Sequence, residues 1–200
     1  MIDKRLNNPP GPRPMHRRPA RHRRGAGFTL MEAALTTVII GTGVLAIMAA
    51  QQAYHQKNNW AQRTGTAMLL ANEIRELTMH LPHHDPITGT MYLGPEPWEQ
   101  GVQDWNDLDD FAGEVDADGF GSGTTFRPPI NALRQEIPGM DNWEQVVEVE
   151  NVLPENISTS VTHPLGSTDM MRVTVTVNYY PPRTGVAEHV TTMSWVVPPR

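Results

Sequence analysis

The chain of 200 residues contains no cysteine. This absence excludes disulfide bonds, thiolate nucleophiles, iron–sulfur clusters and zinc sites that depend on cysteine. The sequence also lacks a Gly-x-Ser-x-Gly nucleophile motif, a phosphate-binding glycine loop, a His-Glu-x-x-His motif and a dinucleotide-binding fingerprint. We therefore expect a protein that is not an enzyme and that carries no organic cofactor, with calcium left open as a metal.

Charge is distributed unevenly along the chain, although the formal net charge of -6 is modest. Residues 1–27 hold eight basic residues and one acid, a net charge of +7, so residues 28–200 carry -13. An acidic body of this kind repels phosphate backbones, which argues against nucleic-acid binding by residues 28–200. Residues 1–27 also contain five prolines and no apolar periodicity, so we expect a disordered basic leader there.

A long apolar run follows the basic leader. Residues 28–50 include a single charged side chain, Glu32, and as a helix they span ~35 Å, which is one crossing of a bilayer. Basic residues before the run and acidic sequence after it place the N-terminus in the cytoplasm and residues 51–200 outside. A cleaved secretory signal is the competing interpretation, but the run is longer than a usual signal core and residues 44–53 contain no Ala-x-Ala site.

The position of Glu32 inside this apolar run needs an explanation, because an ionised carboxylate at mid-bilayer is unfavourable by about 2.5 kcal/mol or more. A snorkelling acid near the interface is one possibility. However, residues 27–32 (Gly-Phe-Thr-Leu-Met-Glu), preceded by a basic leader and followed by an apolar helix, resemble the processing and methylation motif of type IV pilins and type II secretion pseudopilins. The resemblance rests on Gly followed by Phe, on an acid at the fifth mature position and on an uninterrupted apolar helix after the cut.

Membership of this superfamily implies cleavage by a prepilin peptidase after Gly27 and N-methylation of the new terminus at Phe28. It also implies that Glu32 meets the positive N-terminus of a neighbouring subunit when the helices pack into an envelope fibre. The implied partners are other pilin or pseudopilin subunits, the prepilin peptidase and an inner-membrane assembly platform, with the C-terminal head on the periplasmic side.

The apolar helix departs from the family pattern at one position. Many members carry a proline near the twenty-second mature residue, where the helix loosens in the fibre, and this chain has Ala49 there. Gly41 and Gly43 are the candidates to supply that loosening instead, because glycine is a poor helix former. Close helix–helix approach is their alternative role.

Residues 51–81 continue as an amphipathic segment without proline. Apolar residues recur at spacings of three and four, which predicts one helical stripe: Ala67, Leu70, Ala71, Ile74, Leu77 and Leu81. We expect one helix from Phe28 to Leu81, with a bend at Gly65 possible because glycine weakens a helix. Residues 71–77 resemble the corresponding helix of I-type minor pseudopilins and V-type minor pilins, which favours a minor over a major subunit.

Residues 82–142 are rich in Pro, Gly, Asp and Trp and carry weak secondary-structure signals, so we expect a long acidic loop region. A cluster at its start could ligate zinc: His80, His83, His84 and Asp85. Pro82 interrupts any regular spacing among them, so the preferred interpretation is a polar helix terminus, where histidine is mildly favourable. Four aromatic residues are expected to pin the loop to the head: Trp98, Trp105, Phe111 and Phe126.

Within the acidic loop, which also carries Asp109 and Asp110, a short motif imitates the first half of a calcium-binding loop. Glu114, Asp116 and Asp118 alternate ahead of a glycine, and calcium prefers hard oxygen ligands in such an arrangement. The motif is incomplete, because the first position is Glu and the twelfth is Thr125. Calcium binding here competes with the interpretation of a solvated acidic loop built on Asp-Gly turns.

The C-terminal part, residues 143–200, shows β-strand alternation. We expect strands at 143–152, 157–161, 172–180 and 186–197, the last two joined as a hairpin through the turn at 181–185. A helix with one apolar stripe and a sheet with one apolar face bury each other. The predicted fold is therefore α+β, a long N-terminal helix packed on a small C-terminal antiparallel sheet.

The sequence thus predicts a non-enzymatic minor pilin or pseudopilin, a membrane-anchored subunit of a helix-cored fibre. A single-pass receptor or adaptor with an external binding head shares every feature except the motif of Gly27, Phe28 and Glu32. A type II secretion system, a type IV pilus and a DNA-uptake system all fit the sequence equally.

Overall fold

The computed structural model describes residues 28–158 and 161–198. The chain divides into two units, Met1–Ala50 and Gln51–Arg200, and each is described by itself. The basic leader predicted at residues 1–27, which includes Gly27, lies outside the described residues.

A single helix, α1, runs from Leu30 to Thr78 over 49 residues. Its continuity follows from composition, because no proline occurs between Pro19 and Pro82. The helix ends where Met79 N–H donates to the Arg75 carbonyl and Leu81 N–H donates to the Thr78 carbonyl, just ahead of Pro82. The observed helix is two residues shorter at its start and three shorter at its end than predicted, and Gly65 does not interrupt it.

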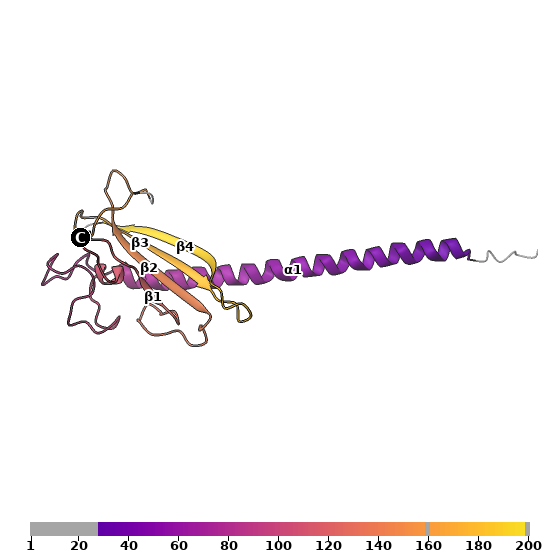
Figure 1. Cartoon of the computed structure of the whole chain (residues 1–200), viewed down its shortest axis with the longest axis horizontal. Helices are drawn as coiled ribbons and strands as arrows, with labels where there is room; N and C mark the ends of the chain where they lie inside the picture. Colours follow the sequence, from indigo (N-terminus) through magenta and orange to yellow (C-terminus); the bar gives the residue numbers. More distant parts are fainter. Residues whose placement is uncertain (1–27, 159–160, 199–200) are drawn as a thin grey trace, which may run out of the picture. The chain divides into compact units, whose positions relative to one another are not determined.

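The second unit contains a four-stranded antiparallel sheet in the order β1-β2-β3-β4 (Figure 1). Its strands are β1 (Thr124–Phe126), β2 (Trp143–Asn151), β3 (Met171–Tyr179) and β4 (Glu188–Val197). Val147 pairs with Thr124 on one side and with Val175 on the other, which fixes the register across the first three strands. A 3₁₀ helix, η1 (Asp109–Ala112), lies in the loop region before β1.

Two strand predictions need correction. The predicted strand at residues 157–161 is wrong for its described residues, 157, 158 and 161, which are not in a strand. β1 was missed, because three residues in a Gly- and Pro-rich loop are too few for period-two alternation to be visible. The other three predicted strands agree with β2, β3 and β4 to within two residues at each end.

The core of the second unit lies between α1 and the sheet. The predicted stripe of α1 is buried at Ala67, Leu70, Ala71, Ile74 and Leu77, while Leu81 is half-buried. The inward face of β2 and β3 is largely valine: Val147, Val149, Val173, Val175 and Val177. This confirms the predicted α+β fold, a long N-terminal helix packed on an antiparallel sheet.

Three of the four loop aromatics belong to this core. Trp105 and Phe111 meet edge to face with ring centroids 4.9 Å apart, and Phe126 lies 6.4 Å from Phe111. Trp98 is instead 56% exposed and packs edge to face on Tyr92. The prediction that aromatics pin the loop is therefore confirmed for three residues, and it is wrong for Trp98.

One polar side chain, Gln145 of β2, joins three parts of the core. Its Nε2 donates to the Leu70 carbonyl of α1 at 2.7 Å and to the Ile130 carbonyl at 3.2 Å. Its Oε1 accepts the Ile130 N–H at 2.8 Å. Gln145 is fully buried, so these bonds replace the water that it loses on folding.

Candidate assembly site and metal-ligand candidates

The described part of the first unit begins with Phe28, which is 72% exposed, and with the start of α1. Thr29 caps the helix: its hydroxyl accepts the Glu32 N–H at 3.2 Å and its carbonyl accepts the Ala33 N–H at 3.1 Å. Threonine followed three residues later by glutamate is the sequence of a capping box, so Thr29 and Glu32, which lie within the predicted processing motif, also start the helix.

Apolar side chains surround the helix in this unit. Among those more than half exposed are Leu30, Met31, Leu35, Val38, Ile39, Ile40, Leu45, Ile47 and Met48. The hydroxyls of Thr36, Thr37 and Thr42 donate to carbonyls four residues earlier, so they add no unsatisfied polar group to this surface. By length and hydropathy α1 is a candidate membrane span, with mean hydropathy 2.1 over its most apolar window and no part of that window buried.

Glu32 is isolated electrostatically. It is the only acid between Asp3 and Glu73, and no Lys or Arg occurs between Arg24 and Lys57. Within residues 28–158 and 161–198 its carboxylate forms no ion pair. A partner for this charge in an apolar environment has to come from another molecule or from outside the described residues.

Gly41 and Gly43 lie within the apolar part of α1. A Cβ atom at either position would meet nothing within 4 Å, so neither glycine is required by packing within the described chain. α1 is continuous through both glycines and through Ala49. Their proposed role in loosening the helix within a fibre stays a prediction.

The histidines at the end of α1 do not converge as a group of possible metal ligands in the described part of the chain. Among the described residues, the one group of three or more possible ligands close enough to share an ion does not include a histidine. His84 instead pairs through Nδ1 with Asp109 Oδ2 at 2.8 Å, and burial lowers the pKa of His84. Asp85 caps a turn by accepting the N–H groups of Ile87 and Thr88.

The motif of Glu114, Asp116 and Asp118 forms an exposed turn. Asp116 Oδ1 accepts the N–H of Asp118 at 3.0 Å and that of Phe120 at 2.9 Å. Val115 and Gly121 form an antiparallel bridge around the turn. The three carboxylates do not converge as a metal-ligand group in the described part of the chain, so the geometry favours the interpretation of an acidic turn.

The structure contains a buried carboxylate cluster that the sequence did not predict. Glu96, Asp107 and Asp110 are 2%, 1% and 0% exposed, and each offers one carboxylate oxygen within 4.8 Å of the others. The partly buried Glu99 lies beside them, with Oε2 accepting the Glu96 N–H at 3.1 Å. The available signal was charge: residues 76–126 contain eleven Asp and Glu residues and no Lys or Arg.

Burial makes the charged form of these carboxyl groups unfavourable. Burial raises the pKa of Asp107 to about 10, and the neighbouring carboxyls of Asp109 and Asp110 add to the rise. Burial likewise raises the pKa of Glu99 to about 8 and that of Asp109 to about 7, and it raises the pKa of Asp110. Burial is the first cause for all four, because a charged carboxylate loses water, and among the described residues no Lys or Arg forms an ion pair with any of them.

Comparisons of the chain with protein-family models, with curated proteins and with solved structures found no significant match. The fold and the first unit define a coarser class. This is an α+β protein with a long N-terminal helix that contains one candidate membrane span, the general architecture that the resemblance to pilins implied.

Proposed function

We propose that this protein is a non-enzymatic minor pilin or pseudopilin, a subunit of a type II secretion pseudopilus or a type IV pilus-like fibre that is anchored in the inner membrane before assembly. The observation that carries the proposal is Glu32, a lone acid on a bare apolar helix, four residues after Phe28 of the processing motif. The basic leader stays in the cytoplasm, the prepilin peptidase cuts after Gly27, and the head faces the periplasm.

A charge pair with a neighbouring subunit would give the acid at position 32 a role. After cleavage the N-terminal amine at Phe28 is positive, and both it and the Glu32 carboxylate lie in or near hydrocarbon. Contact between the amine of one subunit and the Glu32 carboxylate of the next relieves both penalties, whereas loss of one partner leaves a buried charge uncompensated. Fibre assembly then depends on Glu32, while membrane insertion does not.

The first test is processing. In cells that contain a prepilin peptidase and its pilin-like subunits, intact-mass measurement is expected to show a chain that begins at Phe28 with a methylated amine. Replacing Gly27 with leucine is expected to block cleavage. A chain that retains residues 1–27 in those cells would contradict the proposal.

The second test is assembly through Glu32. Glu32→Leu is expected to leave membrane levels and processing unchanged and to abolish crosslinking between the N-terminal helices of neighbouring subunits. Thr36→Val is the matched control, because it changes a polar residue one turn further along the same helix face and is expected to crosslink normally. Unchanged crosslinking of Glu32→Leu would make Glu32 a snorkelling acid and would favour a membrane-anchored receptor or adaptor.

A further inference from the structure

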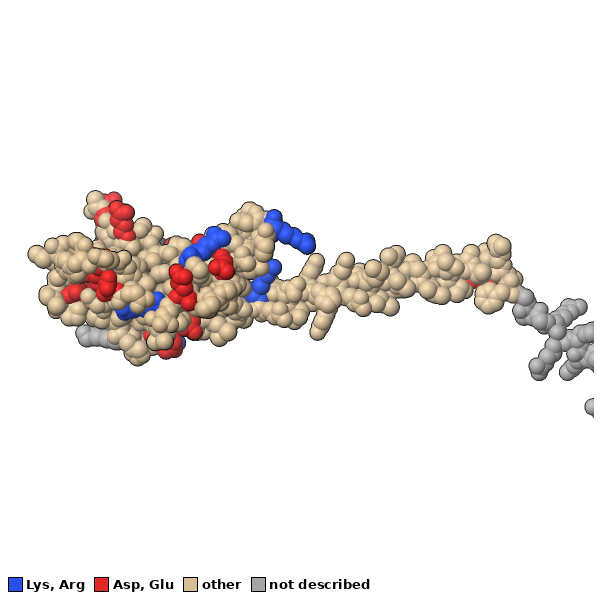
Figure 2. Space-filling model, turned by 90° about the horizontal axis from the view of Figure 1, so that it is seen from below, with Lys and Arg blue, Asp and Glu red and all other residues tan. Residues whose placement is uncertain are grey.

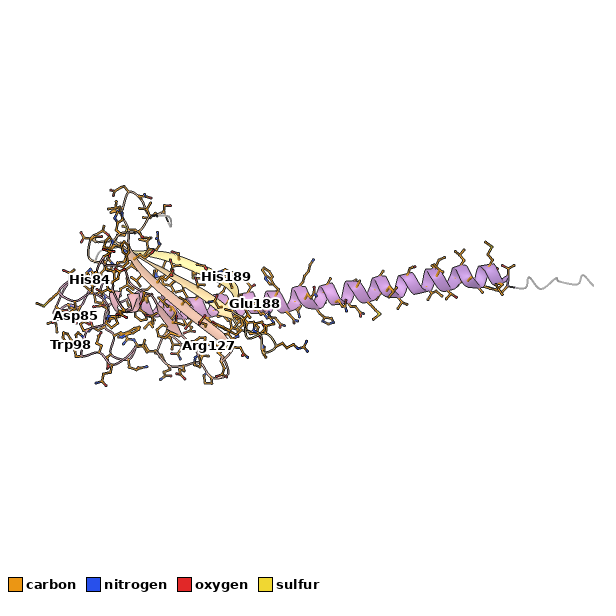
Figure 3. The ribbon with its side chains drawn as sticks, viewed as in Figure 1. His84, Asp85, Trp98, Arg127, Glu188 and His189 are labelled. Atoms are coloured by element: carbon orange, nitrogen blue, oxygen red, sulfur yellow. The ribbon has the colours of Figure 1, made fainter. Side chains whose placement is uncertain are left out.

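Three segments of the long loop meet at the buried carboxylates. The Leu108 N–H donates to the Pro82 carbonyl at 2.9 Å, and Asn106 Nδ2 bridges Asp85 Oδ2 at 3.1 Å and Glu99 Oε1 at 3.3 Å. Figure 3 shows His84, Asp85 and Trp98, which belong to two of these segments, at the same end of the head. Residues 82–88, 96–99 and 106–110 are thus held together around acidic side chains.

One oxygen of each central carboxylate is used to build the loop. Asp110 Oδ2 accepts the N–H groups of Asn106 and Asp107 at 2.8 and 3.1 Å, and Asp107 Oδ1 accepts the Asp110 N–H at 3.2 Å. Glu96 Oε1 accepts the Thr88 hydroxyl at 3.1 Å. These bonds fix the orientation of the carboxylates.

The remaining oxygens are the unusual feature. Glu96 Oε2 and Asp110 Oδ1 are buried and have no hydrogen-bond partner among the described residues. Across residues 28–158 and 161–198, none of Glu96, Asp107 and Asp110 pairs with Lys or Arg. A buried carboxylate is normally paired, hydrogen-bonded, protonated or coordinated to a metal, so these oxygens are open to a proton or to a cation.

We propose that Glu96, Asp107 and Asp110, assisted by Glu99, form a calcium site that fastens the long acidic loop to the head. Two oxygens that share a calcium ion at about 2.4 Å lie up to about 4.8 Å apart, and the three carboxylates meet this limit. Calcium accepts oxygen ligands in irregular geometry and uses several carboxylates. Magnesium keeps several waters, which a site with ligands this buried does not readily admit.

The site differs from the exposed motif of Glu114, Asp116 and Asp118, and it does not depend on the proposed role in a fibre. Figure 2 shows acidic residues spread over the surface of the head, so exposed acids alone do not single out a cation site. Burial and unpartnered oxygens distinguish Glu96 and Asp110 from those surface acids.

The test uses the full chain in detergent, stripped with a chelator and titrated with calcium chloride. Calorimetry is expected to show one ion bound per chain. The unfolding temperature, followed by tryptophan fluorescence, is expected to rise by about 5–10 °C when calcium reaches a hundred times its dissociation constant. Absence of both heat and a thermal shift at 10⁻² M calcium would overturn the proposal, as would a larger shift with magnesium than with calcium.

Two variants locate the site. Asp107→Asn and Asp110→Asn keep the side-chain shape, and the amide oxygen can still accept the loop hydrogen bonds. Each is expected to weaken calcium binding at least tenfold while the calcium-free protein stays folded, because the substitution removes repulsion. Asp116→Asn is the matched control and is expected to bind as the wild type does. Loss of calcium binding in Asp116→Asn, with normal binding in Asp107→Asn and Asp110→Asn, would overturn the assignment.

Discussion

Replacing Gln145 with leucine tests how the head is held together. Leucine has a similar volume, so the change removes hydrogen bonds while leaving little empty space. The Ile130 N–H and carbonyl both lose the Gln145 side chain, and Ile130 is 3% exposed, so water does not readily replace it. The Leu70 carbonyl loses a bond as well but lies inside α1, where the backbone also uses it.

Each unsatisfied buried backbone group costs about 1–3 kcal/mol, so two groups predict a loss of about 2–6 kcal/mol in the free energy of unfolding. With a urea dependence of about 2 kcal/mol per M, the unfolding midpoint of the full chain in mild detergent should fall by about 1–3 M. The buried Trp105 and Trp143 provide the fluorescence signal. Glu148→Leu, at an exposed position of the same strand, is the control and should change stability by about 0.5 kcal/mol or less. A loss below about 1 kcal/mol in Gln145→Leu would refute the reasoning.

Two further substitutions probe the loop and the edge of the head. Gly121→Ala should lower the free energy of unfolding by about 1–3 kcal/mol in the same urea assay, because the new Cβ would clash with the Ala112 carbonyl oxygen. Gly101→Ala is the control and should be close to neutral, because a Cβ there meets nothing within 4 Å. Arg63→Ala should lower the free energy of unfolding by about 1 kcal/mol or less, because the Arg63–Glu188 ion pair is exposed and Arg63 also makes the contact with the Tyr179 ring. A loss above about 2 kcal/mol would contradict this expectation.

The sequence predicts those elements in which a regular pattern of apolar side chains repeats several times. The stripe from Ala67 to Leu77 and the alternating valines of β3 each repeat often enough to identify both the element and its buried face. The same alternation places Gln145 on the inward face of β2, because it shares parity with Val147. It does not reveal that the Ile130 backbone, fifteen residues away, satisfies that side chain.

The carboxylate cluster was harder to predict because its members are not periodic. Glu96 lies in an irregular loop and Asp107 and Asp110 lie at η1, and hydrogen bonds to residues 82–88 hold both places. The spacing of the motif around Asp116 resembles the first half of a calcium-binding loop, yet the Asp116 carboxylate is exposed and stabilises a turn. The absence of Lys and Arg from residues 76–126 indicates unpaired carboxylates better than the spacing of the acids does, although it identifies a region and no particular residues.

The same physical problem occurs at Glu32 and in the head cluster, but the two places require different solutions. Glu32 lies on an exposed apolar helix, and the counterion proposed for it is the terminus of a neighbouring chain, which is carried on a helix of the same kind. Glu96 and Asp110 are buried within their own loop, so a side chain of another protein does not reach them, and the counterion proposed for them is a small ion. Since the two groups belong to different units and the counterions proposed for them differ, neutralising Glu32 should leave calcium binding intact, and Asp110→Asn should leave Glu32-dependent crosslinking intact. Failure of one proposal therefore says nothing against the other.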